Sequence, residues 1–328
     1  MMRAAWYDHN GPADQVLSVG ELPDPEPGVG EVRVRMKSAG INPADVKRRS
    51  GVGGRTMTHP RVVPGDDGAG IIDKVGPRVP AARVGHRVWV HSANHTSAFG
   101  TAAEYVVVPA TQAIELPDRT SFDEGACLGV PALTAHRALF ADGPIDGASV
   151  LVTGGAGAVS HYAIQLAKQA GATVLATAST ADKAAAARGS GADHVIDYRK
   201  PDAAQAILDL VPAGVDRIVD VAFGANLPLT STVIGTGGTI ATYSSDADPE
   251  PALPFYTLMR RGVTIRTVLV FVMPAPALRA GTDHITRLLT DNTLTHRIAA
   301  RYNLESIAEA HRAVENGRSI GKTLLTLP

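Results

Sequence analysis

The sequence predicts an α/β protein of two domains, a β-rich domain and a doubly wound parallel-sheet domain. Its 328 residues exceed what one hydrophobic core usually holds, so two domains are expected. Residues 1–130 carry short apolar runs, whereas strand-like and helix-like segments alternate from residue 149 onward. A glycine-rich turn stands at the start of the alternating part, directly after a buried-type strand.

The first part of the chain is expected to form short strands broken by turns. Its apolar runs are Glu31–Met36, Gly70–Val75, Arg87–Val90 and Ala103–Val108. Glycine and proline separate these runs, and both residues interrupt regular structure. Short strands punctuated in this way are typical of a β-rich domain.

The second part of the chain is expected to form a parallel sheet with right-handed crossovers, because strands and helices alternate along it. The expected strands are Ser149–Thr153, Thr173–Thr177, Val195–Tyr198, Arg217–Val221, Thr239–Thr242 and Val263–Val272. The expected helices between them include Ala158–Gln169 and Asp182–Gly189. The chain then closes with the helical segments Thr282–Thr290 and Leu304–Glu315 and the strand-like segment Lys322–Thr326.

Composition and charge exclude several classes of protein. The 31 basic and 32 acidic residues leave a net charge of −1, so no field attracts a phosphate backbone and we expect no nucleic-acid partner. Cys127 is the only cysteine, so the chain has neither an internal disulfide nor a thiolate cluster for structural zinc. There is no signal-peptide core and no apolar run of about 18 residues, which predicts a cytoplasmic protein without a membrane partner.

The segment Val150–Ser160, VLVTGGAGAVS, predicts a dinucleotide site. Gly154 suits the tight turn, and Gly157 lets the backbone approach a pyrophosphate at the positive end of the next helix. The alternative is an ordinary strand–turn–helix without a ligand. Ser160 stands where a third glycine is usual, and we expect it to push the helix out slightly. The residues expected to contact the dinucleotide here are Gly154, Ala156, Gly157, Ala158 and Val159.

The end of the next strand favours NADPH over NADH. NAD-preferring sites usually carry a carboxylate about 20 residues beyond the turn, and the segment Ala176–Thr180 has none. Ser179 can hydrogen-bond a 2′-phosphate, and Lys183 adds a positive charge. Alternatively, Ser179 caps the following helix and Lys183 is a solvated surface residue.

Several motifs together resemble the medium-chain dehydrogenase/reductase superfamily, in its zinc-free quinone oxidoreductase (zeta-crystallin-like) branch. They span nearly the whole chain and are Ala39–Asp45 (AGINPAD), Pro64–Gly70 (PGDDGAG), Gly100–Tyr105 (GTAAEY), Leu133–Leu139 (LTAHRAL), Asp193–Tyr198 (DHVIDY) and Gly321–Leu325 (GKTLL). The resemblance implies a GroES-like catalytic domain of residues 1–130 and 272–328. It also implies an inserted Rossmann domain of residues 131–271 that binds NADP(H), with the active site in the cleft between the domains.

The resemblance also implies that no metal takes part. Zinc-dependent relatives have cysteine, histidine and cysteine where this chain has Asn42, Asp66 and Val130. An amide, one carboxylate and an aliphatic side chain do not make a tetrahedral nitrogen and sulfur site. The short loop His91–Ser97 replaces the structural zinc lobe, and its two histidines lack a third ligand.

The resemblance assigns further site residues. Asn42 is expected near the nicotinamide ribose or the substrate, although an Asn–Pro turn is the alternative. Lys47 stands where quinone reductases often have tyrosine, so it is a candidate to orient the substrate or donate a proton, or else an exposed lysine. The other cofactor contacts that it implies are Thr134, Tyr198, Val270, Phe271 and Lys322.

Packing is the alternative role for several of these residues. Thr134 is otherwise a helix-packing residue, and Tyr198 a buried aromatic residue at a strand end. Val268–Phe271 is otherwise only part of an edge strand. Because the apolar segment Val263–Val272 is expected to lie at the sheet edge and to need cover, the chain is expected to form a homodimer.

The predicted function follows from the missing Lewis acid. Quinones and α,β-unsaturated carbonyl compounds accept hydride without one, because the product anion is delocalised. We therefore expect a zinc-independent NADPH-dependent reductase of such small molecules. The alternatives are an enoyl-thioester reductase or an alcohol dehydrogenase of the same superfamily, and a non-catalytic dinucleotide-binding structural or RNA-binding protein.

Overall fold

The fold is known from a computed structural model, which describes residues 1–95, 97–317 and 319–328. Thr96, in the segment His91–Ser97, lies outside the described residues. Contacts divide the chain into unit 1, Met1–Val130 with Thr282–Pro328, and unit 2, Pro131–Gly281. The chain leaves unit 1 in α4 (Gly129–Phe140) and returns in α10 (Ala275–Thr290), later than the expected return near Val272.

Unit 1 is built on a seven-stranded sheet centred on β3 (Glu31–Ile41), which pairs with β15, β4 and β6. Its other strands are β4 (Asp67–Val75), β5 (Arg87–Val90), β6 (Tyr105–Pro109), β7 (Ala113–Glu115), β14 (Ile298–Asn303) and β15 (Lys322–Thr326). A separate two-stranded sheet joins β1 (Met2–Trp6) and β2 (Ser18–Leu22). Alternate residues of the first half of β3 are buried, so one face packs into the core.

Short helices complete unit 1. They are α1 (Ala13–Val16), α2 (Pro43–Ser50), α3 (Phe122–Gly125) and α11 (Ile307–Glu315). Helix α2 begins directly after Asn42, with Pro43 in the first helical position, where proline needs no backbone donor. This start places Asn42 at the end of β3 and at the head of α2.

Unit 2 is a six-stranded parallel sheet in the order β10-β9-β8-β11-β12-β13. The strands are β8 (Ser149–Val152), β9 (Thr173–Ala178), β10 (His194–Asp197), β11 (Val215–Asp220), β12 (Ile234–Thr242) and β13 (Thr264–Thr267). The strand order reverses between β8 and β11, and ligands of such sheets bind at the carboxyl ends flanking this point. The fold class predicted from the sequence is confirmed.

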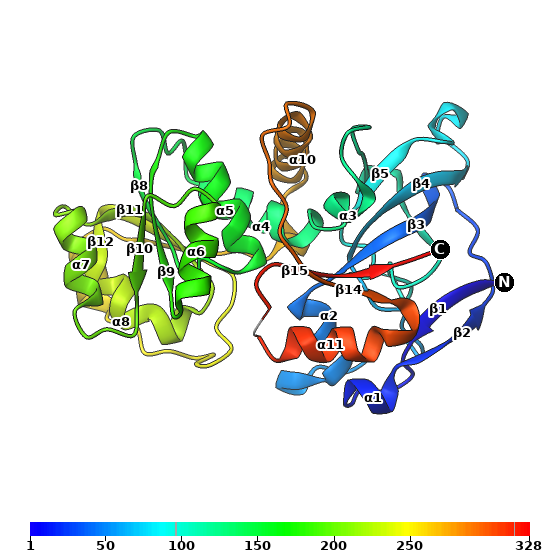
Figure 1. The fold of residues 1–328 in the computed structure, drawn as a ribbon, viewed down its shortest axis with the longest axis horizontal. Helices are drawn as coiled ribbons and strands as arrows, with labels where there is room; N and C mark the ends of the chain where they lie inside the picture. Colours follow the sequence, from blue (N-terminus) through cyan, green and yellow to red (C-terminus); the bar gives the residue numbers. More distant parts are fainter. Residues whose placement is uncertain (96, 318) are drawn as a thin grey trace. The chain divides into compact units, whose positions relative to one another are not determined.

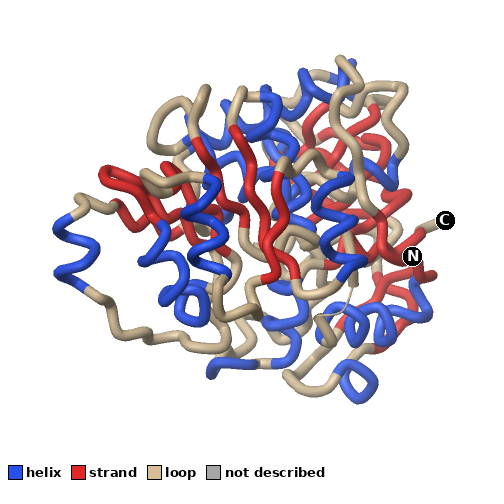
Figure 2. Tube along the Cα trace, turned by 60° about the vertical axis from the view of Figure 1, so that its left-hand side comes forward, coloured by secondary structure: helices blue, strands red, loops and turns tan. Residues whose placement is uncertain are grey.

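Helices cover both faces of the parallel sheet. They are α5 (Ala158–Gln169), α6 (Ala181–Gly189), α7 (Ala203–Leu210) and α8 (Phe223–Val233), with α9 (Phe255–Arg260) before β13. Figure 1 shows α5 and α6 on one side of the strands and α7 and α8 on the other. In the turned view of Figure 2, the strands run side by side between helices. Because both faces are covered, every residue of β8 is buried, which explains the apolar run Val150–Val152 that follows Ser149 in this strand.

The expected strand Val263–Val272 is wrong in its second half. Strand β13 ends at Thr267, and Val270–Val272 forms a short 3-10 turn. The neighbouring β12 ends at Thr242 and pairs with β13 over Thr239–Thr242, so β12 offers no further residues to pair with beyond Thr267. Among the described residues, the structure contains no helix with the length and apolarity needed to cross a bilayer.

Candidate functional site

The glycine turn of unit 2 is anchored on the neighbouring strand. Gly154 has a φ of +60°, which favours glycine. Its backbone N–H donates to the Thr177 hydroxyl at 3.0 Å, and that of Gly155 donates to the Thr177 carbonyl at 2.8 Å. These bonds hold the turn against β9, so the Gly154 and Gly155 amides stabilise the turn and are already used as donors.

The start of α5 presents the next backbone amides. Gly157 is the exposed N-cap residue, and Ala158 and Val159 form the first turn, where N–H groups have no partner within the helix. Ala156, just before the cap, is buried. Anions bind at such helix starts, since the helix dipole and the amides both favour negative charge. The geometry therefore suits the pyrophosphate of a dinucleotide.

Ser160 fits inside the position that a glycine usually takes. Its side chain is buried, and its hydroxyl donates to the Thr153 carbonyl at 3.0 Å. The Tyr243 hydroxyl also shares a hydrogen bond with Ser160, while burial raises the pKa of Tyr243. The serine thus bonds the first turn of α5 to the end of β8.

The carboxyl ends of β9 and β10 carry the residues that the sequence assigns to a 2′-phosphate. Ser179 and Lys183 are partly exposed, and Tyr198 is exposed. The hydroxyl of Thr180 accepts the backbone N–H of Lys183, so Thr180 caps α6. The alternative that Ser179 is the cap is wrong, because the helix begins one residue later than that reading needs.

Sequence reasoning missed three basic residues beside this position. A pocket of about 290 Å³ is lined by Arg188, Arg199 and Lys200, together with Thr180 and Asp197. Arg199 binds Asp197 through two nitrogens at 2.9 and 2.7 Å, and these hydrogen bonds lower the pKa of Asp197 to about 2. The signal available was the basic pair that follows Tyr198.

In unit 1, the carboxylate of Asp66 is buried and bound by Arg48. The Arg48 guanidinium bridges Asp66 and Asp45, and the Asn94 backbone N–H donates to Asp66 at 3.2 Å. Burial first, and then the charge of Asp45, raise the pKa of Asp66, whereas Arg48 opposes the rise. Arg48 was not identified from the sequence, because an Arg on a short helix carries no signal of a distant partner.

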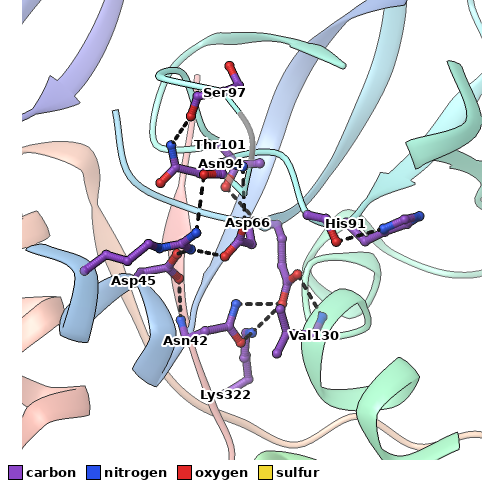
Figure 3. Close-up of polar contacts among 12 residues, drawn as sticks. Asn42, Asp45, Asp66, His91, Asn94, Ser97, Thr101, Val130 and Lys322 are labelled. Carbon is purple, nitrogen blue, oxygen red and sulfur yellow. Dashed lines mark hydrogen bonds and ion pairs between the residues drawn. The ribbon is translucent and has the colours of Figure 1, made fainter. Parts of the chain in front are cut away.

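Asp67 is the centre of a second buried group, the Asp67 group, which also contains Asn42, Lys322 and the Val130 backbone N–H. Its Oδ1 accepts the Val130 backbone N–H at 2.9 Å, at the start of α4. Its Oδ2 accepts the Lys322 ammonium and the Asn42 side-chain amide, each at 2.8 Å. The dashed lines from Asn42, Lys322 and Val130 in Figure 3 show these contacts. Three segments far apart in the chain therefore meet at one carboxylate.

The residues at the expected zinc positions do not fit zinc. The Asn42 amide is bound to Asp67 and Lys322, Asp66 is bound to Arg48, and Val130 offers only an aliphatic side chain. Structural and catalytic zinc sites need several nitrogen, sulfur or carboxylate ligands in tetrahedral array. Among the described residues, no group of three or more His, Cys, Asp and Glu side chains is arranged to hold a metal ion.

The remaining sequence-assigned residues are placed as follows. Lys47 is partly exposed on α2, and no described contact joins it to the Asp67 group. Thr134 is buried on α4, Val270 is buried in the 3-10 turn, and Phe271 is partly exposed. His91 is buried beside Trp89, and this burial lowers its pKa to about 4.

Comparisons with known families agree with this architecture. Residues 28–118 match the family model described as the alcohol dehydrogenase GroES-like domain. Residues 158–281 match the family model described as zinc-binding dehydrogenase. The first match lies within residues 1–130, whereas the second extends to residue 281, beyond the expected boundary at residue 271. The second family is named for a metal that the residues at the expected positions do not fit.

Whole-chain relatives point the same way. Human quinone oxidoreductase is 31% identical over 338 aligned positions, which cover 100% of this chain and 98% of the relative. A solved NAD-dependent alcohol dehydrogenase has a TM-score of 0.91 and 32% identity, with both chains fully covered. A mycobacterial protein solved in complex with NADPH has a TM-score of 0.87 and 27% identity, again with both chains fully covered.

These likenesses extend over the full chain and join the two domain types in one polypeptide. The Rossmann fold, the anchored glycine turn and the helix start of α5 together support a nicotinamide dinucleotide as cofactor. The chain is thus an oxidoreductase of small molecules, and it belongs to the quinone oxidoreductase branch of the medium-chain dehydrogenase/reductase superfamily.

Proposed function

We propose that this chain is an NADPH-dependent reductase that delivers hydride to quinones or α,β-unsaturated carbonyl compounds without a metal ion. One observation carries the proposal. At two of the three positions where zinc-dependent relatives place a ligand, Asp66 is already bound by Arg48, and Asn42 by Lys322 and Asp67. Side-chain cations thus stand where a metal cation would otherwise be needed.

The residues of unit 2 that would hold the dinucleotide follow from its fold. The first-turn amides of α5 would bind the pyrophosphate, and the adjoining glycine turn would let it approach the backbone. Thr134 and the segment Val270–Phe271 are proposed for the nicotinamide end. When bound, the dinucleotide supplies the hydride.

The preference for NADPH is supported by charge at the end of β9. That strand end, at Ala178, carries no carboxylate to hold a free ribose 2′-hydroxyl. Ser179, Lys183 and Tyr198 are proposed to contact the 2′-phosphate. The basic residues Arg199 and Lys200 add positive charge nearby, and Arg199 neutralises Asp197.

The class of acceptor proposed here is one that can be reduced without a metal ion as Lewis acid. A hydride and its two electrons add to the β-carbon of an enone, the carbon–carbon π bond opens, and negative charge moves to the carbonyl oxygen. Water then supplies the proton at the α-carbon. A quinone likewise accepts one hydride and then one proton, and it becomes a hydroquinone. Both anions are delocalised, so hydrogen bonds and nearby charge stabilise them without a Lewis acid.

Asn42 and Lys47 are proposed to serve the acceptor. Asn42 is held by the Asp67 group, so its amide is oriented before the acceptor binds. Lys47 lies further along α2, where its partly exposed ammonium can orient a carbonyl or anionic substituent. These roles make Asn42 a hydrogen-bond donor and Lys47 an adaptable electrostatic contact.

The protein is further proposed to be cytoplasmic, because its reaction would draw on intracellular NADPH. It is also proposed to form a homodimer. Strand β13 is the last strand of its sheet, and among the described residues it pairs with β12 alone. Leu269 and Val272, just beyond it, are 53% and 67% exposed, and Tyr256 before it is 65% exposed. Exposed apolar side chains beside an edge strand are normally covered by another chain. Sedimentation at several concentrations would test the dimer.

The central experiment is a spectrophotometric screen of NADPH oxidation over quinones, enals, enones and enoyl thioesters, with NADH in parallel and a chelator in matched wells. We expect turnover of quinones or enones with NADPH, unchanged by the chelator. Turnover confined to simple alcohols or aldehydes with a bound metal would overturn the proposal. Tight binding of NADPH without oxidation by any acceptor would point to a non-catalytic protein.

A further inference from the structure

The Asp67 group contains more contacts than a single ion pair between Asp67 and Lys322. Asp67 is fully buried, and each oxygen has a separate task. One oxygen accepts the Val130 backbone N–H at the start of α4, while the other receives Lys322 and Asn42. The helix start favours the negative charge, and Lys322 compensates it. Removing the lysine therefore leaves a buried carboxylate beside Asn42 without its cation.

The backbone around this group is shaped to admit Lys322. The ammonium side chain is 3% exposed, which is unusual for lysine. A Cβ at Gly40 would lie 2.6 Å from Lys322 Cε and 2.2 Å from the Ala126 carbonyl oxygen. A Cβ at Gly129 would lie 2.0 Å from Asp67 Oδ1. Two glycines thus leave the space that the pair occupies.

The side-chain amide of Asn42 bonds to both members of this pair. The Asp45 carboxylate accepts the backbone N–H of Asn42 at 2.8 Å, which serves the helix start. The side chain of Asn42 donates one Nδ2 hydrogen to Asp67 and accepts Lys322 at Oδ1. An amide carries a second Nδ2 hydrogen, and a bond from an ammonium to its oxygen makes that hydrogen a stronger donor.

We propose that Lys322 is a positioning residue for hydride transfer, which neutralises Asp67 and polarises the Asn42 amide so that negative charge can develop on the acceptor oxygen. The inference rests on the proposed function, because it needs an acceptor whose oxygen becomes anionic near Asn42. An uncompensated carboxylate at that place would oppose the developing charge, and the opposition is strong where water is excluded. Lys322 acts through Asn42 and Asp67, and it does not itself contact the acceptor.

The test compares four variants with the wild type: Lys322→Met, Asp67→Asn, the double variant, and Lys74→Met as a control. Lys74 forms an exposed pair with Glu26 in the same unit. The measurements are kcat with an acceptor found in the screen, the isotope effect of deuterium at the transferred position, the Kd of NADPH by fluorescence, and thermal unfolding.

We expect Lys322→Met to lower kcat by about tenfold or more and to raise the deuterium isotope effect. The family resemblance assigns Lys322 to the cofactor, but its buried ammonium is bound to Asp67 and Asn42, so we expect the NADPH Kd to change by less than about twofold. Asp67→Asn should lose less, because it removes the opposing charge. The double variant should recover most of the loss of Lys322→Met, since neither charge remains unpaired. Lys74→Met should behave as the wild type.

Other outcomes overturn the inference. A purely structural role makes the double variant at least as slow as either single variant and leaves the isotope effect unchanged. If Lys322→Met fails to fold, the double variant decides, because it has no buried unpaired charge, and a kcat reduced tenfold in that folded protein would contradict us. Wild-type kinetics in Lys322→Met defeats the inference alone, whereas a wild type inactive on every quinone and enone defeats the proposed function and the inference together.

Discussion

The Ser160 hydroxyl donates a hydrogen bond of 3.0 Å to the Thr153 carbonyl, and so it joins the first turn of α5 to the residue that precedes the glycine turn. The Tyr243 hydroxyl bonds to the same serine from the end of β12. A residue that departs from the usual glycine pattern therefore adds a link between three adjacent elements at the carboxyl edge of the sheet.

This link predicts a stability effect. We expect Ser160→Ala to lower the free energy of unfolding by about 1 kcal/mol, because the Thr153 carbonyl and the Tyr243 hydroxyl each lose a partner. Denaturant unfolding followed by circular dichroism measures the change, with the more exposed Ser179→Ala as the matched control. Equal midpoints for Ser160→Ala and the wild type would show that the link contributes nothing.

Gly157 tests the pyrophosphate site separately from the fold. A Cβ there would make only ordinary contacts, 3.4 Å to the Gly154 carbonyl oxygen and 3.7 Å to the Ser160 hydroxyl. We therefore expect Gly157→Ala to fold with a loss of about 1 kcal/mol or less. The added methyl should weaken NADPH binding by about tenfold, because it occupies the side from which the pyrophosphate approaches. Calorimetric titration measures it, and unchanged affinity would place the dinucleotide elsewhere.

Substitution of Ser179 is expected to shift the cofactor preference from NADPH toward NADH. A carboxylate at the end of β9 accepts the ribose 2′-hydroxyl of NADH and repels the 2′-phosphate of NADPH. We expect Ser179→Asp to lower kcat/KM for NADPH by about tenfold or more while kcat/KM for NADH holds or rises. Initial rates with both dinucleotides at one fixed acceptor concentration give the ratio. A parallel fall for both would mean that Ser179 does not face the ribose.

Metal removal is expected to leave the reaction unchanged. Arg48 binds Asp66 and Lys322 binds Asn42, which are the two polar side chains at the expected zinc positions. Prolonged dialysis against a chelator should therefore preserve kcat, and added zinc should not raise it. Elemental analysis of the active protein is the check. One zinc ion per chain, lost together with activity, would contradict a metal-independent reaction.

Buried histidines predict acid sensitivity. His311 is 1% exposed on α11, and burial, followed by the positive charge of Arg49, lowers its pKa to about 3. Unfolding then takes up a proton between the unfolded pKa of 6.5 and the folded value, so the free energy of unfolding falls as pH falls through this window. His91 and His296 shift in the same direction.

The contribution of His311 can be isolated by substitution. Each proton taken up on unfolding gives a slope of up to about 1.4 kcal/mol per pH unit. We expect His311→Gln to flatten the pH dependence of urea unfolding below pH 6.5, while the surface control His9→Gln leaves it unchanged. A slope in His311→Gln equal to that of the wild type would show that His311 does not carry the effect.

Much of unit 2 was predictable from the sequence because its signals are local. The buried strand β8, the glycine turn and helix α5 occur where the sequence places them. Strand β13 is shorter than its apolar sequence suggests, since a strand extends only as far as its neighbour offers hydrogen-bond partners. The local pattern marks an apolar segment, and the partner strand sets its end.

By itself, the sequence determined the two-domain α/β class, the dinucleotide turn and the residues at the expected zinc positions, since each depends on neighbours in the chain. Only the tertiary structure showed which basic side chains bind the polar residues in this part of the molecule. Lys322 meets Asp67 across 255 residues, and Arg48 meets Asp66 from another element. Such contacts arise when separate strands and helices pack around a buried charge that must be compensated, and no local pattern in the chain specifies that partner.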